Sequence, residues 1–266
     1  MSIFEEWWLP IEAAVNDKIP LSFGQNLYKE IYMNIIKDDR WANYLNGLWV
    51  TLKVSFFAIL VGTLLGTLLA VLRLPEVTDL RYKGKNPLRK IGVAIVHFFS
   101  WFAKFYIDLI RGTPLLLQVL IINFGIFGTV KIDKVIIGVI ACGLNSAAYV
   151  AEIVRGGLIS VDKGQTEAGR SLGLSGPSTM VNIILPQAAK SALPALCNEF
   201  IALIKETSIL SYIALTELTK AGDYIRSRTY SAFTPYIVSG LLYLLVTIVL
   251  TKLIGRLERR LANSDH

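Results

Sequence analysis

Residues 54–72 read VSFFAILVGTLLGTLLAVL, a run of 19 residues without a charged side chain. A helix that crosses the hydrocarbon core of a bilayer needs about 20 mainly apolar residues. Further uncharged runs cover Gly112–Val130, Val135–Ala151 and Thr229–Thr251. Because four such runs lie in one chain of 266 residues, the sequence predicts an all-α polytopic membrane protein. It excludes a soluble protein and a membrane β-barrel, whose strands give alternating segments of about 10 residues.

Composition and charge agree with a membrane location. The chain is 53% apolar and 18% charged, whereas an ordinary soluble domain is about 45–50% apolar and about 25% charged. Basic loops on the cytoplasmic side of a membrane explain the net charge of +7. We therefore expect a multi-pass protein of the cytoplasmic (cell) membrane that does not bind nucleic acid.

Cysteine and histidine supply neither a catalytic nor a metal site. The two cysteines, Cys142 and Cys197, lie inside apolar segments and are expected to be buried thiols rather than a disulfide. The two histidines are His97 and the terminal His266, so no cluster has the spacing of metal ligands. A membrane-embedded enzyme would need acids, histidines or nucleophiles gathered at one depth. The sequence therefore predicts no catalytic residue, no metal and no cofactor bound by this chain.

The positions of lysine and arginine predict the orientation. The first apolar run is followed by Arg73, Arg81, Lys83, Lys85, Arg89 and Lys90. The last run is followed by Lys252, Arg256, Arg259 and Arg260. Because loops rich in Lys and Arg stay in the cytoplasm, we expect the N-terminus outside and the C-terminus in the cytoplasm.

Residues 1–42 are expected to form an amphipathic, extracytoplasmic helical segment ahead of a transmembrane domain that covers 43–262. The segment carries Glu5, Glu6 and Asp17 before any long apolar run, so it lacks the basic and apolar regions of a signal peptide. Aromatic side chains suit the interface between lipid and water. This segment has Trp7, Trp8, Phe23, Tyr28, Tyr32 and Trp41.

About five transmembrane helices are predicted from run length and topology, with spans near 44–73, 104–128, 135–156, 192–213 and 233–256. Hydropathy alone would rank the fourth span low, because it contains Glu199, Lys205 and Glu206. The last run must nevertheless start outside if it is to end in the cytoplasm, so one crossing must lie between 191 and 228.

The second span allows an alternative. We expect an interfacial helix at 88–103 that leads into a single span, whereas a six-span arrangement would make 91–110 and 112–130 separate crossings. In the first span, Gly62 and Gly66 form a GxxxG pair, which permits close packing of helices. Packing within the chain is the preferred interpretation, and a contact between subunits is the alternative.

The polar segment 158–190 lies between the third and fourth spans. Gly164 and Gly173 enclose about eight residues, enough for two turns of helix. Leu172, Leu174 and Met180 would give this polar helix an apolar face. Because so short a helix is marginal alone in water, it must dock, either on other helix ends or on a partner.

The same segment resembles the cytoplasmic signature of the import-type ABC permeases. That signature reads Glu-Ala-Ala, three residues, Gly, nine residues, then Ile-x-Leu-Pro. The matching positions in this chain are Glu167, Ala168, Gly173, Ile183, Leu185 and Pro186. The single departure is Gly169 in place of the second alanine.

Further segments resemble the polar amino acid branch of that family and extend the resemblance over about 44–262. They are Asn46–Leu52, Arg111–Gln118, Ala148–Gly157, Lys205–Ile209 and Leu257–Leu261. The resemblance implies the permease subunit of an ATP-driven importer of polar amino acids that works by alternating access. It also implies a cytoplasmic coupling helix seated on an ATP-binding subunit, with Glu167, Ala168, Gly169 and Gly173 at its key positions.

The partners that the resemblance implies are a dimer of ATP-binding subunits, a second copy or a homologous permease, an extracytoplasmic solute-binding protein and the amino acid. The chain has no G-x-x-x-x-G-K-[ST] motif. We therefore do not expect this chain to be an enzyme, and we expect ATP with Mg²⁺ on the partner subunit.

Ionisable residues inside spans are costly in lipid and mark either ion pairs or functional sites. Asp108 with Arg111, and Glu152 with Arg155, lie three residues apart on predicted helices, so each pair is expected to interact locally. A bridge between Arg111 and Glu152 is the alternative.

The candidates for a substrate pathway are Glu152, Tyr149, Gln118, Asn123, Thr207 and Ser208. Tyr149 and Glu152 lie three residues apart, so ring and carboxylate share a helix face that suits an ammonium group or a cationic side chain. For Thr207 and Ser208 the alternative is a hydrogen bond back to their own helix.

A secondary amino acid transporter is the alternative function. Such transporters usually show internal repeats and interrupted helices at corresponding positions, and the sequence shows no clear repeat. A scaffold without transport activity would leave the charges near the membrane unexplained.

Overall fold

The structure, a computed structural model, describes residues 3–74 and 87–262. Every regular element in these two stretches is a helix, as the sequence predicts. The basic residues Arg81, Lys83 and Lys85, on which the expected orientation partly depends, lie outside the described residues.

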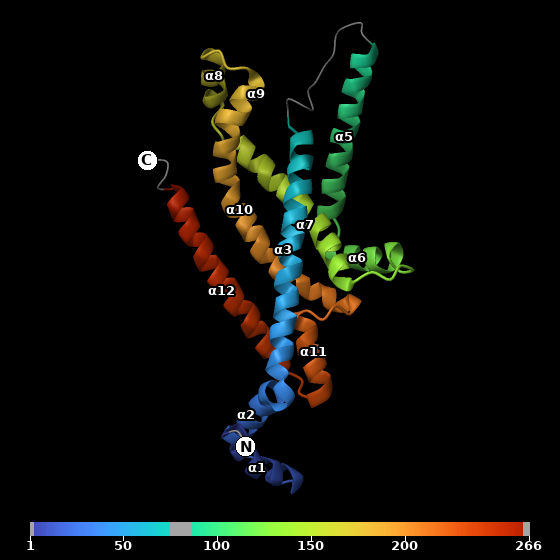
Figure 1. Ribbon diagram of the computed structural model, residues 1–266, viewed down its shortest axis with the longest axis vertical. Helices are drawn as coiled ribbons and strands as arrows, with labels where there is room; N and C mark the ends of the chain where they lie inside the picture. Colours follow the sequence, from blue (N-terminus) through green and yellow to red (C-terminus); the bar gives the residue numbers. More distant parts are fainter. Residues whose placement is uncertain (1–2, 75–86, 263–266) are drawn as a thin grey trace.

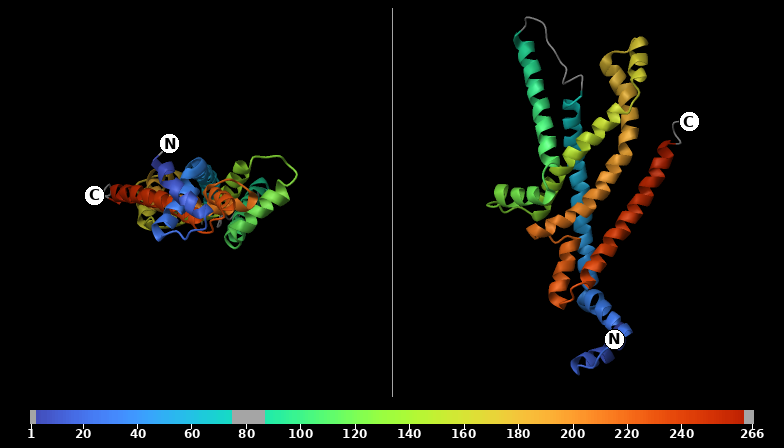
Figure 2. Two further views of the ribbon diagram at one scale, coloured as in Figure 1. Left: turned by 90° about the horizontal axis from the view of Figure 1, so that it is seen from below. Right: turned by 180° about the vertical axis from the view of Figure 1, so that it is seen from behind.

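Long helices run roughly along the long axis of the molecule (Figure 1; Figure 2). They are α3 (Arg40–Leu72), α5 (Pro87–Arg111), α7 (Lys134–Ile159), α10 (Leu185–Glu206) and α12 (Thr234–Ala262). Segments that include α3, α5, α7 and most of α12 are long and apolar enough to cross a membrane. The crossing by α10, which carries Glu199 and three further charged residues, stays a prediction.

The centre of the bundle is the packing of α3 against α7. A Cβ on Gly62 would lie 2.9 Å from the Cβ of Ser146, and a Cβ on Gly66 would lie 2.7 Å from the carbonyl oxygen of Ala147 and from the Cβ of Val150. The two glycines therefore let the helix backbones approach closely. This confirms the preferred interpretation of the GxxxG pair, which is packing within the chain.

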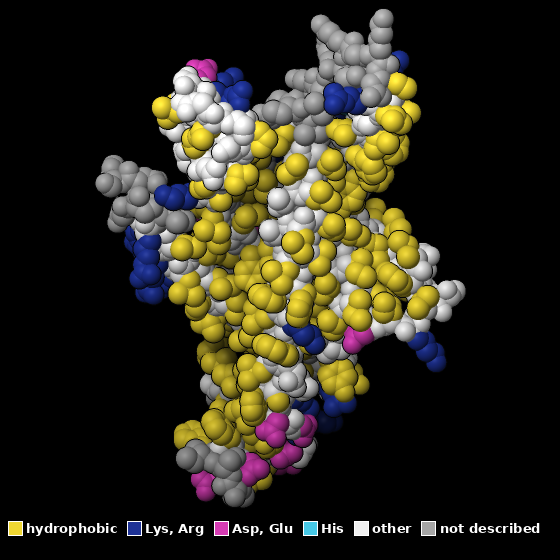
Figure 3. All heavy atoms as spheres, turned by 45° about the horizontal axis from the view of Figure 1, so that its top comes forward, with side chains coloured by type: hydrophobic (Ala, Val, Ile, Leu, Met, Phe, Trp, Pro, Cys, Tyr) yellow, Lys and Arg dark blue, Asp and Glu magenta, His cyan; other side chains and the backbone are white. Residues whose placement is uncertain are grey.

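The two ends of the bundle differ. α8 (Lys163–Ser171), α9 (Gly176–Thr179) and the start of α5 lie at one end, and the N-terminal helices α1 (Ile3–Asn16) and α2 (Phe23–Ile31) lie at the other (Figure 1). Hydrophobic side chains cover the middle of the face in Figure 3, and Asp and Glu gather near the N-terminal helices. Such an apolar middle is what a protein embedded in a bilayer requires.

The expected helix boundary near residue 103 is wrong. α5 is one unbroken helix that ends at Arg111, rather than an interfacial helix at 88–103 that leads into a span at 104–128. The break falls at Thr113, because the following Pro114 disfavours helical conformation in the residue before it and has no N–H of its own. The sequence analysis ended the interfacial helix before Lys104 because of that single charged residue, and the helix continues through it.

After the break, the chain forms two short helical pieces that run across the bundle (Figure 2). These are α6 (Leu115–Leu120) and the π-helix η3 (Ile121–Ile126). Twelve residues of helix reach about 18 Å, less than the roughly 30 Å of a hydrocarbon core. The separate crossing at 112–130 that six spans would require is therefore not formed as a helix of that length.

The fourth predicted span is shifted along the chain. α10 begins at Leu185, and a 3₁₀ helix, η5 (Thr207–Ile213), follows it, whereas the expected span covered 192–213. Pro186 is tolerated near the start of α10, because a proline in the first turn sacrifices no intrahelical hydrogen bond. α3, α7 and α12 cover the spans expected at 44–73, 135–156 and 233–256.

The N-terminal helices pack against each other through aromatic rings. The rings of Trp8 and Tyr32 stack with 4.7 Å between their centroids, and the hydroxyl of Tyr28 donates to the carbonyl of Phe4 at 2.7 Å. Trp8 and Tyr32 are both buried. Residues 3–36 thus form a small helical unit with a buried cluster of its own, which the amphipathic pattern of residues 1–42 did not predict; the extracytoplasmic location of the segment stays a prediction.

A clamp of polar side chains ties this N-terminal unit to the corner between α11 (Leu218–Thr229) and α12. Asn34 is fully buried; its amide donates to the Glu30 carboxylate at 3.0 Å, and its oxygen accepts from the Thr229 hydroxyl at 2.8 Å. The Glu30 carboxylate also accepts from the hydroxyls of Ser231 and Thr234, each at 2.6 Å. The N-terminal segment is therefore fixed to the far end of the chain.

We expect Asn34→Ala to loosen this clamp. The substitution removes one of the two acceptors of the Thr229 hydroxyl, which also reaches the Ile225 carbonyl, and one donor to the Glu30 carboxylate. A buried polar group that loses a partner costs about 1–3 kcal/mol. Thermal unfolding of the purified protein should show a lower midpoint, and limited proteolysis should release residues 1–33 faster. Asn26→Ala is the control, because Asn26 is exposed and bonds only to the nearby carbonyl of Leu21. Equal behaviour of the two variants would contradict the clamp.

Candidate functional site

α8 is a short helix with both ends capped. The carboxylate of Asp162 accepts a hydrogen bond from the Gly164 N–H at 2.7 Å, which satisfies a free donor of the first turn. At the other end Gly173 has a φ of +85°, and the N–H groups of Gly173 and Leu174 donate to the carbonyls of Arg170 and Gly169. This glycine ending turns the chain toward α9 and limits α8 to about 2.5 turns.

α8 rests on the helical segment that follows it. A Cβ on Gly169 would lie 2.8 Å from Cγ2 of Thr179 and 3.0 Å from Cδ1 of Ile183. The family signature has an alanine at this position. Gly169 lacks the alanine methyl group, for which the neighbouring side chains leave little room. Glu167 and Ala168 are exposed. Of the proposed coupling residues, Glu167, Ala168 and Gly169 thus lie on α8 with Gly169 facing inward, and Gly173 lies in the turn that ends the helix.

The tip of α8 is apolar and exposed. Leu172 is 84% exposed, and Val181 on the π-helix η4 (Met180–Ile184) is 59% exposed. An apolar side chain at the end of a polar two-turn helix gains nothing from water. The geometry fits a helix that docks on a partner, and the partner itself remains a prediction from the signature.

Glu152 lies near the end of α7 between two arginines. Its Oε1 accepts from Nη1 of Arg73 at 3.0 Å, and its Oε2 accepts from Nη2 of Arg155 at 2.6 Å. The local pair of Glu152 and Arg155 is confirmed. The sequence analysis missed the link to Arg73, although Arg73 is the first charge after the first apolar run. A substrate cation at Glu152 would have to displace one of these arginines.

Tyr149 also has an arginine of this chain beside its ring. The guanidinium carbon of Arg111 lies 5.5 Å from the ring centroid. The predicted pair of Asp108 and Arg111 is wrong: within the described residues no ion pair joins them. Arg111 is the last residue of α5, so its side chain reaches across to α7 instead of back along its own helix.

Gln118 holds the break between α5 and α6 in place. Its amide nitrogen donates to the carbonyls of Ile110 and Thr113 at 2.8 Å and 3.1 Å. Its amide oxygen accepts from Asn145 of α7 at 3.0 Å. Because both the nitrogen and the oxygen of the amide are hydrogen-bonded, Gln118 holds α6 against α5 and α7. The hypothesis of a substrate pathway did not anticipate this role.

Asn123 and Thr207 have local partners as well. Asn123 lies on η3 rather than on a continuous second span. Its side-chain oxygen accepts a hydrogen bond from Nζ of Lys134 at 2.6 Å. The Thr207 hydroxyl donates to the carbonyl of Ile204 at 2.7 Å, which is the alternative bond back to its own helix. A role of either residue in the pathway stays a prediction.

Ser208 lines a polar hollow of about 570 Å³ between η5, α11 and the start of α12. The other lining residues are Ile209, Ser211, Tyr212, Thr219, Lys220, Asp223 and Tyr236. The sequence analysis missed this site because it assigned no helix between the spans predicted at 192–213 and 233–256. A signal was present: Leu218, Ala221, Gly222 and Ile225 have the i, i+3, i+4, i+7 spacing of an amphipathic helix, and all are buried.

Glu217 fixes the start of α11 beside this hollow. Its fully buried carboxylate accepts from the N–H groups of Thr219 and Lys220 at 2.8 Å and 2.7 Å. It also accepts from the hydroxyl of Tyr243 on α12 at 2.8 Å. The cap therefore sets the position of α11 relative to α12, and with it the shape of the hollow.

Asp223 is the acidic group of the hollow, on a helix that is not among the candidate membrane spans. Hydrogen bonds from Lys220 and then Arg226 lower the pKa of the Asp223 carboxyl to about 2. A group with a lowered pKa stabilises the fold above its unfolded pKa, near 3.9 for Asp. That contribution is lost as the pH falls through the folded value.

We therefore expect Asp223→Asn to lower the stability by its full amount above pH 4. The difference in stability from wild type should shrink as the pH falls and vanish near pH 2. The measurement is the difference in thermal midpoint between variant and wild type from pH 6 to pH 2. Asp133→Asn, at the start of α7, gives a matched control for acid effects on the rest of the chain. A difference for Asp223→Asn that stays constant with pH would contradict the charge-assisted network.

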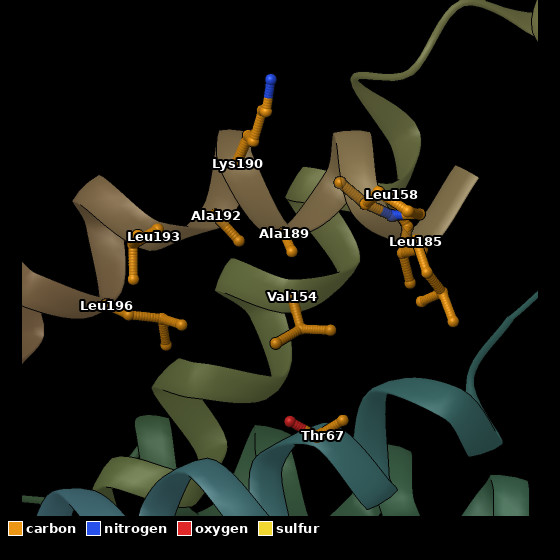
Figure 4. A pocket seen from close by; sticks show the side chains of 11 residues that line it. Thr67, Val154, Leu158, Leu185, Ala189, Lys190, Ala192, Leu193 and Leu196 are labelled. Atoms are coloured by element: carbon orange, nitrogen blue, oxygen red, sulfur yellow. The ribbon is translucent and has the colours of Figure 1, made fainter. Parts of the chain in front are cut away.

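A second hollow, of about 400 Å³, is mainly apolar and lies between α3, α7 and α10 (Figure 4). Val154 and Leu158 of α7 and the α10 side chains Leu185, Leu193 and Leu196 line it, with Thr67 of α3 contributing a hydroxyl. A zwitterionic solute would lose its hydration there for few hydrogen bonds in return, because Thr67 and Lys190 are the polar side chains of the lining. The hollow beside α11 is therefore the better fit for a polar ligand.

Comparisons with known proteins agree with these features. A family model for "Binding-protein-dependent transport system inner membrane component" matches residues 91–263. The arginine transport system permease protein ArtQ of Bacillus subtilis (strain 168) is 35% identical over 223 residues, which are 83% of this chain and 93% of that protein. The putative glutamine transport system permease protein GlnP of Rickettsia bellii (strain RML369-C) is 36% identical over 218 residues, 81% of this chain and 91% of that protein.

A solved structure has the same arrangement of helices. It is described as an amino acid ABC transporter with histidines, and it aligns with a TM-score of 0.71 and 39% identity over 82% of this chain and 94% of that chain. The MetNI methionine ABC transporter in an inward-facing conformation aligns with a TM-score of 0.65 and 18% identity over 85% of this chain and 99% of that chain. The second likeness concerns the fold alone.

Proposed function

Because this chain belongs to the family of binding-protein-dependent transport system inner membrane components, we propose that it is the permease subunit of an ATP-driven importer of polar amino acids. It is a multi-pass membrane protein with no expected enzymatic activity of its own. A separate subunit would hydrolyse ATP with Mg²⁺, and a solute-binding protein would deliver the amino acid.

The observation that carries this proposal is α8. Its caps fix its length, Gly169 seats it on Thr179, and Leu172 stands exposed at its tip. An ATP-binding subunit needs a rigid helix on the cytoplasmic face through which it can move the permease. α8 lies on the face expected to be cytoplasmic. A permease without a partner subunit would leave Leu172 exposed to water.

A continuous helical run connects α8 to the polar hollow. α9, η4, α10 and η5 follow one another without a break from Gly176 to Ile213. α8 contacts η4 at one end, and η5 contacts α11 at the other. A displacement of α8 is therefore transmitted along this run to Ser208 and its neighbours. That path supports alternating access driven by the partner ATPase.

α7 moves with the same run, because close contacts join them. A Cβ on Gly157 would lie 2.8 Å from the carbonyl oxygen of Ala188 and 2.9 Å from the Cβ of Ala192. The hydroxyls of Ser160 and Ser191 lie 2.9 Å apart. A push on α8 would therefore tilt α7 and α10 together, and α7 carries the cluster of Glu152 and its arginines.

The polar hollow supports a zwitterionic substrate. Lys220 and Asp223, which pair with each other at 2.9 Å, supply both signs of charge, so a zwitterion would have to exchange with this pair. Ser208, Ser211 and Thr219 supply hydroxyls. An α-amino acid presents a carboxylate and an ammonium, so one group of each charge with neutral donors around them is a suitable set. A second copy of this chain, or a homologous permease, would complete the pathway around a two-fold axis.

The test is reconstitution of the chain with its ATP-binding subunit and binding protein in liposomes. We expect one pool of amino acids to stimulate ATP hydrolysis and to be taken up at the expense of ATP. A stable complex without stimulation by any pool would refute the substrate class and keep the family role. Uptake driven by an ion gradient without ATP would support the secondary transporter instead.

A further inference from the structure

A basic hollow of about 390 Å³ lies where the end of α3 meets α5. It is lined by Arg73, His97, Ser100, Trp101 and Lys104. The four residues from α5 are spaced i, i+3, i+4 and i+7, so they form one stripe of that helix. Arg73, at the end of α3, faces the stripe. Arg73 also pairs with Glu152, whereas the proposed transport mechanism and the family signature do not use the four residues from α5.

Within residues 3–74 and 87–262, the basic groups of this hollow are only partly neutralised. Among the described residues, neither His97 nor Lys104 makes an ion pair or a hydrogen bond. Arg73 bonds to Glu152 through one nitrogen, but Glu152 is shared with Arg155, so two arginines stand against one carboxylate. The hollow therefore carries an excess of positive charge.

The setting of the hollow is a lipid-facing helix. Arg73 follows directly on the apolar run that ends α3, which places it at a membrane boundary. On α5, Phe98, Phe102 and Phe105 are each at least 49% exposed, and Trp101 is 61% exposed. Exposed aromatic side chains at this density need an apolar surrounding. A lysine among them is costly in lipid unless an anion accompanies it.

We propose that this hollow binds the phosphate group of an anionic phospholipid from the adjacent leaflet. Lys104 supplies a full charge, Arg73 supplies the guanidinium N–H groups that Glu152 leaves free, and the Ser100 hydroxyl supplies a further donor. The acyl chains lie along Phe98 and its neighbours on α5. Basic pockets between transmembrane helices on the cytoplasmic side bind lipid head groups in this way. A zwitterionic lipid binds less well, because its ammonium group meets the same positive charges.

Native mass spectrometry of the full chain in detergent tests the proposal. Phosphatidylglycerol, phosphatidylcholine and inorganic phosphate are the probes. We expect wild type to retain phosphatidylglycerol over phosphatidylcholine, and Lys104→Ala to weaken that binding about five-fold, the value of one cation near a membrane surface. Lys104→Arg should restore it. Lys252→Ala is the matched control, since Lys252 is an exposed lysine on α12, and it should change binding less than about two-fold.

The outcomes that overturn the proposal are separate. If Lys104→Ala and Lys252→Ala weaken phosphatidylglycerol binding equally, the lipid is attracted by the overall surface charge and not by a specific site. Binding of inorganic phosphate at the same affinity, with no retained lipid, would refute the lipid as the source of the phosphate. Size-exclusion chromatography runs beside each sample, and a loss of oligomer in Lys104→Ala would assign the hollow to a contact between chains instead. None of these readouts depends on transport activity.

Discussion

Gly173→Asp is expected to abolish ATP-coupled uptake while the protein inserts and folds normally. Gly173 has a φ of +85°, a conformation that costs an L-residue about 1–2 kcal/mol. The new carboxylate would also lie at the negative end of the α8 dipole. Because nothing lies within 4 Å of a Cβ at this position, the damage is confined to the end of α8. Uptake and ATP hydrolysis by the reconstituted complex are the measurements.

Gly173→Asn is the matched control for this prediction. Asparagine has the shape of aspartate, tolerates the left-handed region and carries no charge. We expect Gly173→Asn to keep a substantial part of the uptake at equal membrane levels. Wild-type uptake by Gly173→Asp would refute the role of α8 in coupling, and loss of the protein from the membrane would show that the residue serves folding instead.

Gly66→Leu is expected to have the largest effect on stability. Its Cβ alone would lie 2.7 Å from the Ala147 carbonyl oxygen, a backbone atom that cannot turn aside, and three more carbons would follow. Overpacking of a core costs about 1–3 kcal/mol or more, out of a typical stability of about 5–15 kcal/mol. The thermal midpoint of the purified protein should fall by roughly 6 °C or more.

Gly240→Leu provides the comparison. Gly240 lies in α12, where nothing is within 4 Å of a Cβ, and the glycine is exposed. This substitution should leave the midpoint unchanged or raise it slightly, because leucine is the better helix former. Equal midpoints for the two variants would contradict the close approach of α3 and α7.

The sequence predicted the helical membrane fold because lipid leaves the backbone few alternatives. A chain in hydrocarbon must satisfy its own hydrogen bonds, so an apolar run such as residues 54–72 dictates a helix without any knowledge of its neighbours. Local capping is equally direct. Gly164 and Gly173 enclose the predicted short helix in the sequence, and the structure has α8 at 163–171.

Contacts between distant residues did not follow from the sequence. Arg73 and Glu152 are 79 positions apart, and only the crossing of α3 with α7 brings them together. The predicted partner of Arg111 was its helix neighbour Asp108, and the structure replaces it with the ring of Tyr149. Periodicity describes one helix at a time, so it favours local pairs and overlooks pairs between helices.

The sequence by itself determined the helical class, the order of the apolar segments and the capped helix α8, because these depend on short-range rules of solvation and backbone geometry. The tertiary structure decided the turn after α5, the arginines around Glu152, the clamp on Asn34 and the polar hollow at Ser208. Each of these requires side chains from two or more helices to meet in space. The positions at which helices cross depend on the packing of whole surfaces, such as the glycine face of α3 against α7, and that information is distributed over the chain.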